Sequence, residues 1–411
     1  MMATKYKDSG IPWIGEIPSD WDVVRTKNVF ACSKSLVGED WSHTQLLSLT
    51  TKGVKEVAIG STSGKVPDSY ETYQVVNKDD LVMCLFDLDC SAVFSGVSNF
   101  HGMISPAYKV LKTLDGYSPA FYGYWFDYIF DGRKYKYLSK NIRYSLTYDE
   151  FAALGIAAPP LLTQQRIADF LDRKCAEIDE LAALQETMIA ELKRYKQSVI
   201  TESVTKGLDP DVPMKDSGVK WIGEIPERWD VMRLKFVANR RNKKADDTNL
   251  KYIGLEHIVG FSKEMVETEN VYDNEGANMC YNRDVIFGKL RPYLGKAKVI
   301  EETCCCSSEF LVLCNVHCPD YLRYLMLSGW FIEIVNASTY GTKMPRANAD
   351  FIMNMIIPVP LTAEQQQIAD YLDRKCAEID ELIAIKQQKI EALKEYKKSV
   401  IFEYVTGKKE I

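Results

Sequence analysis

The feature that most constrains this chain is an internal repeat about half its length. A motif that starts at Asp8 and contains DSG, WIGEIP and WDV recurs from Asp216, at an offset of 208. The eleven residues LDRKCAEIDEL, from Leu171 to Leu181, return unchanged as Leu372–Leu382, at an offset of 201. Units of this size far exceed the roughly 20 to 50 residues of stacked solenoid repeats. Each copy can therefore bury a core of its own.

The two copies share their ends and differ in their middles. Such a contrast is expected of a protein that needs two equal scaffolds and two different binding surfaces. Ordinary duplication followed by drift is the alternative. Drift alone should not preserve the ends while changing the centres, so we favour the first interpretation.

Each middle has the pattern of a mixed domain. Apolar segments typical of strands, such as 80–86 and 284–290, are separated by Gly, Asn and Asp turns. A helix is expected to begin near Pro119 in the first copy and near Pro319 in the second, because Pro suits the first helical position. We predict an α+β fold with globular domains over 1–160 and 214–360, long helices over 161–206 and 361–405, and a linker over 207–213.

The end of each copy is the stronger helix prediction. From Thr163 to Ser203 and from Thr362 to Tyr404, no Pro or Gly interrupts sequences rich in Ala, Leu, Glu, Gln and Lys. Matching apolar stripes predict that the two helices pair as an antiparallel coiled coil, which would place the domains at opposite ends. The alternative is that each helix packs on its own domain. The residues predicted to pair are Ile178, Leu181, Ile189, Leu192, Tyr195 and Val199 with Ile379, Leu382, Ile390, Leu393, Tyr396 and Val400.

Composition narrows the class of protein without naming a ligand. The net charge of −6 does not favour nucleic-acid binding, but it averages over acidic helices, whereas DNA responds to local patches. No segment has about 18 consecutive apolar residues, so we expect a cytoplasmic protein with no membrane contact. The eleven cysteines are expected to be reduced thiols. Cys304–Cys306 with Cys314, His317 and Cys318 could suggest zinc, but paired CxxC knuckles are missing and an apolar run follows, so no metal or cofactor is expected.

No catalytic residue is predicted. An adenine methyltransferase would need a glycine-rich cofactor loop and an Asn/Asp-Pro-Pro-Tyr/Phe motif, and the sequence has neither. Residues 60–66 resemble a P-loop, but the glycine spacing is one residue short and Val66 cannot supply the hydroxyl that binds magnesium. The Glu-x-Lys sequences at Glu191 and Glu395 lie on the predicted helices, where they are typical of a solvated face.

Four motifs together resemble the specificity subunits of type I restriction-modification enzymes. They are the repeated opening motif, the segments 102–108 (GMISPAY) and 287–294 (FGKLRPYL), and the entry into the second helix over 358–369. The resemblance covers essentially the whole chain. It implies two target-recognition domains, each recognising one half of an asymmetric bipartite DNA target, and two helices that set the gap. It also implies docking of two modification (adenine methyltransferase) subunits and of restriction subunits, with no catalytic activity in this chain.

The first copy departs from the family pattern at two places. It has Cys84-Leu85-Phe86-Asp87 where the second copy has Lys289-Leu290-Arg291, and its helix entry lacks the glutamate. We therefore expect the two domains to recognise different bases. The alternatives are a standalone nuclease or methyltransferase of unfamiliar type, and a purely structural coiled-coil scaffold.

DNA contact requires Lys and Arg for phosphates, together with side chains that can reach base edges. Any one of these residues could equally be solvated surface. The candidates for DNA contact are Lys52, Lys55, Lys65, Arg133, Lys134, Lys136, Arg143 and Tyr144 in the first domain, and Arg240, Arg241, Lys289, Arg291, Tyr293, Lys296, Lys343 and Arg346 in the second.

Overall fold

The computed structural model describes residues 5–33, 35–60, 69–88, 94–131, 133–138, 144–245, 250–267 and 276–411. The chain divides into two compact units. The first contains Met1–Gln185 and Gln388–Ile411, and the second contains Glu186–Gln387. Two long helices, α4 (Leu161–Lys206) and α8 (Thr362–Val405), each contribute one end to each unit.

The first unit is built on a four-stranded antiparallel sheet in the order β4-β11-β8-β9. Helix α1 packs on this sheet with Phe121, Trp125 and Phe126 fully buried, and it begins at Pro119 as predicted. The strands are β1 (Tyr6–Asp8), β2 (Glu16–Pro18), β3 (Asp22–Arg25), β4 (Phe30–Cys32), β5 (Leu47–Thr50), β6 (Gly53–Glu56), β7 (Gln74–Val76), β8 (Leu81–Met83), β9 (Ser95–Val97), β10 (Gly102–Ile104), β11 (Lys109–Thr113) and β12 (Gly155–Ala158), and the short helices are α1 (Pro119–Asp131), α2 (Tyr135–Leu138) and α3 (Tyr148–Ala153).

The second unit repeats this plan with the sheet order β16-β22-β19-β20 and adds a three-stranded sheet, β17-β21-β18. Helix α5 begins at Pro319, again as predicted, and packs against β19 and β20. The strands are β13 (Met214–Asp216), β14 (Glu224–Pro226), β15 (Asp230–Arg233), β16 (Asn239–Arg240), β17 (Tyr252–Ile253), β18 (Asn278–Cys280), β19 (Val285–Gly288), β20 (Ala297–Val299), β21 (Cys304–Cys306), β22 (Phe310–Cys314) and β23 (Ile356–Val359), and the short helices are α5 (Pro319–Met326), α6 (Gly329–Ala337) and α7 (Ala349–Asn354).

The repeated opening motif has the same role in both units. It forms a hairpin, β1-β2 or β13-β14, followed by a strand that pairs with the segment leading into the long helix, β3 with β12 or β15 with β23. The motif's second tryptophan, Trp21 or Trp229, is buried beneath the hairpin. The shared ends of the two copies thus build the joint between each domain and a long helix.

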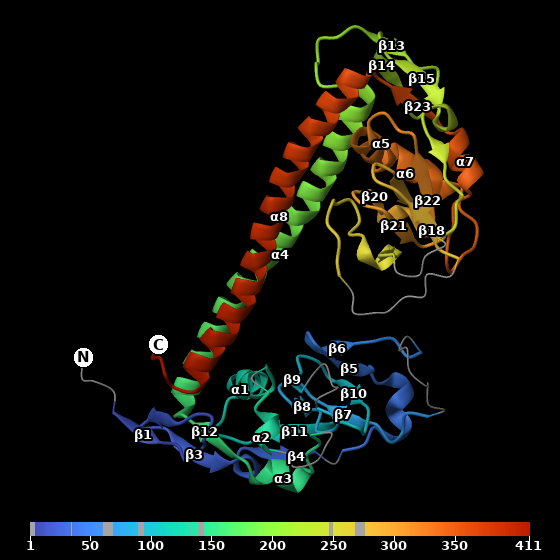
Figure 1. Ribbon diagram of the computed structural model, residues 1–411. Helices are drawn as coiled ribbons and strands as arrows, with labels where there is room; N and C mark the ends of the chain where they lie inside the picture. The colour runs from blue at the N-terminus through green and yellow to red at the C-terminus, as the bar shows by residue number, and fades with distance from the viewer. Residues whose placement is uncertain are drawn as a thin grey trace. The chain divides into compact units, whose positions relative to one another are not determined.

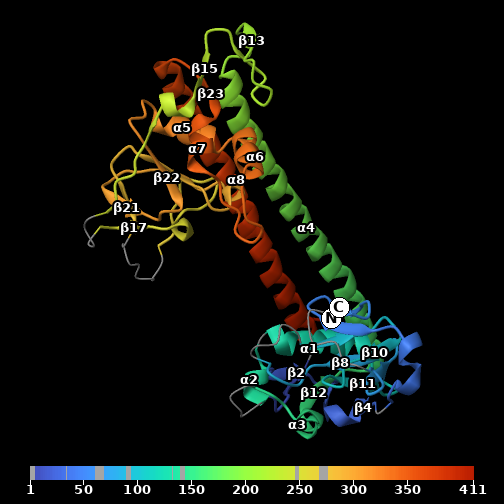
Figure 2. The ribbon, with the colours of Figure 1, turned by 90° about the vertical axis from the view of Figure 1, so that its right-hand side faces the viewer.

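Within each unit, α4 and α8 lie side by side and run antiparallel (Figures 1 and 2). Lys397 of α8 donates to both carboxylate oxygens of Asp179 at 2.8 and 2.7 Å in the first unit. Lys196 of α4 makes the same bidentate contact with Asp380 in the second, at 2.8 and 2.6 Å. The predicted α+β fold with antiparallel helices is therefore confirmed.

The buried seam of each long helix follows alternating steps of three and four residues, as coiled-coil packing requires. On α4 it runs through Gln164, Ala168, Leu171, Cys175, Ile178, Ala182, Gln185, Ile189, Leu192, Lys196, Val199 and Ser203, of which Ala182 and Leu192 are partly buried and the others buried. Of the residues predicted to pair, Ile178, Ile189, Val199, Ile379, Ile390 and Val400 are buried, and Leu192 and Leu393 are partly buried. The other four, Leu181, Tyr195, Leu382 and Tyr396, are between 46 and 51% exposed.

The eleven-residue repeat also holds each domain to its helix. The Tyr124 hydroxyl donates to Asp172 at 2.6 Å in the first unit, and the Tyr324 hydroxyl donates to Asp373 at 2.6 Å in the second. The seam residues Leu171 and Leu372 are fully buried. Identical sequence is therefore explained by three tasks: fastening the domain, packing the seam, and receiving a lysine from the opposite helix.

Candidate nucleic-acid interface

In the second unit, the residues that follow β19 form a tight turn beside the loop 340–347. The Lys289 backbone N–H donates to the Glu309 carbonyl at 2.9 Å, and the Ala347 N–H donates to the Lys289 carbonyl at 2.9 Å. Leu290 forms a bridge with Arg346. These backbone bonds bring Lys289 and Arg346, predicted from separate motifs, to one place.

Positive charge gathers at this turn. Arg346 makes a bidentate ion pair with Glu309, with Nε and Oε2 2.8 Å apart. Burial lowers the pKa of Lys289, and the neighbouring charges of Arg240, Arg346 and Lys244 lower it further, while Glu309 opposes them. We call Lys289, Arg240, Lys244 and Arg346 the basic cluster.

Only two carboxylates balance the basic cluster in the part of the chain that is described. They are Glu309 and Asp350, which lies 3.3 Å from Arg240. Among the described residues, four cations therefore face two carboxylates, which gives this part of the site an excess of positive charge. Such an excess favours an anion such as a phosphate group.

The turn itself is held by its backbone, while its long side chains are exposed. Arg291 has a φ of 50°, and its N–H donates to the Pro345 carbonyl at 2.7 Å. Residues Pro292–Leu294 then form a 3-10 turn, which Gly295 ends with a φ of 57°. Arg291 and Tyr293 are exposed on this rigid support, where a guanidinium can reach a base edge or a phosphate.

Two other predicted contacts of this domain are engaged in structural bonds. Arg241 makes a bidentate ion pair with Asp284, at 2.8 and 3.0 Å, and its guanidinium lies over the Tyr281 ring. Lys296 donates to the Leu255 carbonyl at 2.6 Å. Lys343, by contrast, is exposed on the loop 340–347. Arg241 and Lys296 hold the domain together, so the charge that they offer to a ligand is reduced.

The first unit has the same backbone arrangement with different side chains. The Leu146 N–H donates to the Leu85 carbonyl at 2.7 Å, as Ala347 does to Lys289. Asp87 then has a φ of 47°, the same left-handed conformation as Arg291. Leu85 and Asp87 therefore occupy the places of Lys289 and Arg291. An acceptor stands where the second domain has a donor.

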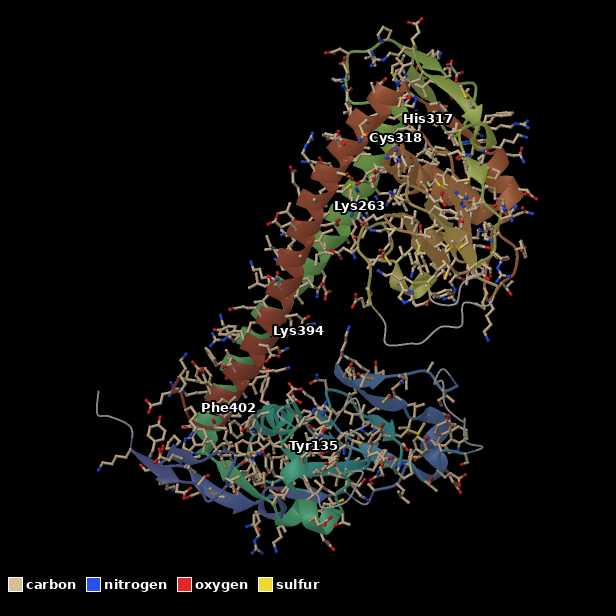
Figure 3. All side chains as sticks on the ribbon, viewed as in Figure 1. Tyr135, Lys263, His317, Cys318, Lys394 and Phe402 are labelled. Carbon is tan, nitrogen blue, oxygen red and sulfur yellow. The ribbon has the colours of Figure 1, made fainter. Side chains whose placement is uncertain are left out.

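The other predicted contacts of the first domain lie on two segments. Lys52 and Lys55 are exposed on the β5-β6 hairpin. Lys134 and Lys136 flank Tyr135, which Figure 3 labels, and the Lys136 ammonium lies 5.1 Å from the centre of the Tyr144 ring. Arg133 is exposed at the start of the same segment, and Lys65 and Arg143 lie outside the described residues.

Comparison with known proteins agrees with this architecture. The family model described as a type I restriction modification DNA specificity domain matches residues 226–395. The MjaVIII specificity subunit of a type I restriction enzyme from Methanocaldococcus jannaschii is 28% identical over 280 residues, 63% of each chain. The EcoDI specificity subunit from Escherichia coli is 22% identical over 55% of this chain and 56% of its own. The chain thus spans less than two thirds of the length of these two relatives.

Solved structures agree on the fold. A chain from a structure of a type I restriction-modification system aligns with a TM-score of 0.69 at 14% identity, covering 95% of this chain and 98% of the other. The HsdS subunit from Thermoanaerobacter tengcongensis aligns with a TM-score of 0.52 at 16% identity over the same shares. Residues 226–395 thus match the type I restriction modification DNA specificity domain, and the chain as a whole shares the fold of these subunits.

The cysteines that could have suggested zinc are buried. Cys304–Cys306 form β21, and all three are at most 1% exposed. The Sγ atoms of Cys280 and Cys306 lie 3.3 Å apart, and a hydrogen bond with Cys280, together with burial, raises the pKa of Cys304. Among the described residues, no group of three or more His, Cys, Asp or Glu side chains could hold a metal ion. None of the described helices combines the length and the apolar character needed to cross a membrane.

The equivalence of Asp87 and Arg291 agrees with the sequence, in which Cys84–Asp87 stands where the second copy has the Lys289–Arg291 motif, and the matching backbone bonds support it. One feature was not predicted from the sequence, the burial of Lys196. Lys196 was passed over because a lysine in a helix is usually solvated, yet it is only 7% exposed. A signal did exist for Lys196: the offset of 201 relates it to Lys397, so both copies carry lysine at one seam position.

Proposed function

We propose that this chain is the DNA-specificity subunit of a type I restriction-modification complex. Each domain recognises one half of a bipartite, asymmetric target in double-stranded DNA, and α4 and α8 set the gap between the halves. The chain docks two adenine methyltransferase subunits and, in the full complex, the restriction subunits. It contributes recognition, and its partners contribute the chemistry.

The observation that carries the proposal is that one frame supports two different turns. Both units repeat the tyrosine–aspartate bond to the long helix and the lysine–aspartate pair between helices. At the matching turn, the second unit presents Lys289 and Arg291 and the first presents Leu85 and Asp87. Arginine donates to guanine, whereas a carboxylate accepts from the amino group of cytosine, so the two turns suit different bases.

Sequencing the methylated adenines of a host that expresses this chain with its methyltransferase subunits tests the proposal. We expect a split motif with different halves and a constant gap. Methylation by the purified chain alone would refute the proposal that its partners supply the chemistry. A continuous methylated motif would refute the bipartite target.

The spacer role has its own test. We would insert seven residues, two helical turns, after Thr187 in α4 and seven at the equivalent place after Gln388 in α8. The insertion preserves the three-four seam and adds about 10 Å at 1.5 Å per residue. That length corresponds to about three base pairs at 3.4 Å each. If the gap in the methylated motifs stays unchanged, the helices do not set the distance between the two halves of the target.

A further inference from the structure

A short loop of the second domain, residues 261–263, covers the end of the Lys289–Gly295 turn. The Phe261 N–H donates to the Gly295 carbonyl at 2.8 Å. A Cβ atom added to Gly295 would lie 2.4 Å from the Phe261 ring. The ring therefore rests directly on this glycine, and the position of the turn depends on the position of Phe261.

The same loop is bound to the helix pair through Lys196. The Lys196 ammonium donates to the Phe261 carbonyl at 2.9 Å and to the two oxygens of Asp380 at 2.8 and 2.6 Å. The lysine is 7% exposed, and it occupies a seam position of α4. Its aliphatic stem covers the seam, while its ammonium joins α8 to the domain.

Two neighbouring contacts fix the rest of the loop. Lys263, labelled in Figure 3 beside the paired helices, lies 2.7 Å from Asp373 of α8. The buried guanidinium of Arg323 donates to the Ser262 carbonyl at 2.6 Å and to the Ala297 carbonyl at 3.2 Å. All three loop residues are thus held from the side of the helices or of α5.

The equivalent lysine in the first unit, Lys397, makes no such bond to a backbone carbonyl of its domain among the described residues, although its charge acts on Asp127 and Asp131 of α1. Lys397 donates to both oxygens of Asp179, as Lys196 does to Asp380. Within the described ranges, no carbonyl of the first domain accepts from Lys397. The repeat therefore supplies a matched pair: two lysines with the same ion pair, only one of which reaches a recognition turn.

We propose that Lys196 is a positioning residue for recognition of the second half of the target. It holds the 261–263 loop on the helix pair, and the loop holds the Lys289–Gly295 turn, so that the helices determine where Arg291 and Tyr293 are presented. In the described part of the first domain, no such link from Lys397 to the turn is present. This inference rests on the proposed function.

The test compares Lys196→Met with Lys397→Met in the complex of the full chain with its methyltransferase subunits. Both variants keep an apolar stem in the seam and lose one ion pair, and Lys196→Met also loses the hydrogen bond to the Phe261 carbonyl. The melting temperature of each complex is therefore measured first, and recognition is compared at a temperature at which both variants are folded. Methylome sequencing then gives the tolerated bases at each position of both halves. The second half is identified as the one altered by Arg291→Gln.

We expect Lys196→Met to lower discrimination by tenfold or more at positions of the second half and to leave the first half unchanged. Lys397→Met should leave the discrimination of both halves unchanged. Lys196→Arg should restore most of the loss, because a guanidinium can donate to both the carboxylate and the carbonyl. Should Lys196→Met not fold, Lys263→Gln takes its place, and the same half should lose discrimination.

Equal effects of the two methionine variants, or an effect on both halves, would overturn the positioning role and leave Lys196 as a stabiliser of the helix pair. Unchanged recognition in a folded Lys196→Met complex would overturn it as well. A wild-type complex that methylates no bipartite motif would instead overturn the proposed function, so the two failures are distinguishable.

Discussion

Replacing Lys289 by Gln should weaken DNA binding through phosphate contact and leave sequence preference intact. Lys289 belongs to the basic cluster, in which four cations face two carboxylates. The substitution removes one positive charge and keeps a side chain of similar length. A cation that neutralises one phosphate makes the slope of log affinity against log salt concentration more negative by about 0.9.

The expected magnitude follows from that slope. The salt concentration changes fourfold between 50 and 200 mM. Over this range, the loss of one phosphate contact should change the ratio of wild-type to variant affinity by about 3.5-fold. The ratio should be larger at 50 mM than at 200 mM, because the wild type gains more from low salt. Fluorescence anisotropy with labelled duplexes, measured in the complex with methyltransferase subunits, gives the slopes. Lys394→Gln is the control, because Lys394 lies on α8 and pairs with Glu391 at 3.1 Å.

The pattern across sequences separates a phosphate contact from a base contact. Lys289→Gln should weaken cognate and non-cognate duplexes by the same factor. Arg291→Gln should cost about 1–3 kcal/mol on the cognate base pair and little on others, because it removes a donor on an exposed, rigid turn. An unchanged salt slope in Lys289→Gln would refute the assignment of the basic cluster to DNA.

Three further substitutions test individual contacts. Tyr324→Phe should lower the free energy of unfolding by about 1.5–3 kcal/mol, because it removes a hydrogen bond to the carboxylate of Asp373; urea denaturation measures this loss, and a stability equal to wild type would contradict it. Gly295→Ala should lower the melting temperature and relax recognition of the second half, since the added Cβ meets the Phe261 ring; recognition as strict as wild type would show that the turn need not rest on that ring. Arg241→Gln should lower the free energy of unfolding by about 1.5–3 kcal/mol, because it leaves the buried carboxylate of Asp284 without its cation. The salt dependence of DNA binding should stay that of wild type. A shallower salt slope would instead show that Arg241 contacts a phosphate.

The helical frame could be predicted because its signals are local. The eleven-residue repeat and the absence of Pro and Gly define α4 and α8, and Pro119 and Pro319 mark where α1 and α5 begin. The exact seam was harder to predict. Counting apolar residues selects Leu181 and Tyr195, which are half exposed, and omits Lys196, whose stem packs in the seam while its charge is paired elsewhere.

The availability of each predicted cation could not be read from the sequence. Arg241 is paired with Asp284, 43 residues away, and Lys296 with a carbonyl 41 residues earlier. Nothing in the local sequence distinguishes them from Arg291 or Lys343, which are exposed. Charge at a site is the sum over residues that folding brings together, and only the fold shows which cations are paired with a carboxylate, as Arg241 is, or held by a carbonyl, as Lys296 is.

The matching turns of the two domains connect backbone strain to specificity. Asp87 and Arg291 both have a positive φ, a conformation that costs a residue with a Cβ about 1–2 kcal/mol relative to the right-handed regions. Glycine would avoid this cost at either position, and neither domain uses it. Both copies keep a charged side chain on a strained backbone, and the two charges are opposite. This combination is expected where a residue is selected for contact with a ligand rather than for stability. If the proposed function holds, the frame fixes where that side chain is presented, and its charge selects the base that it recognises.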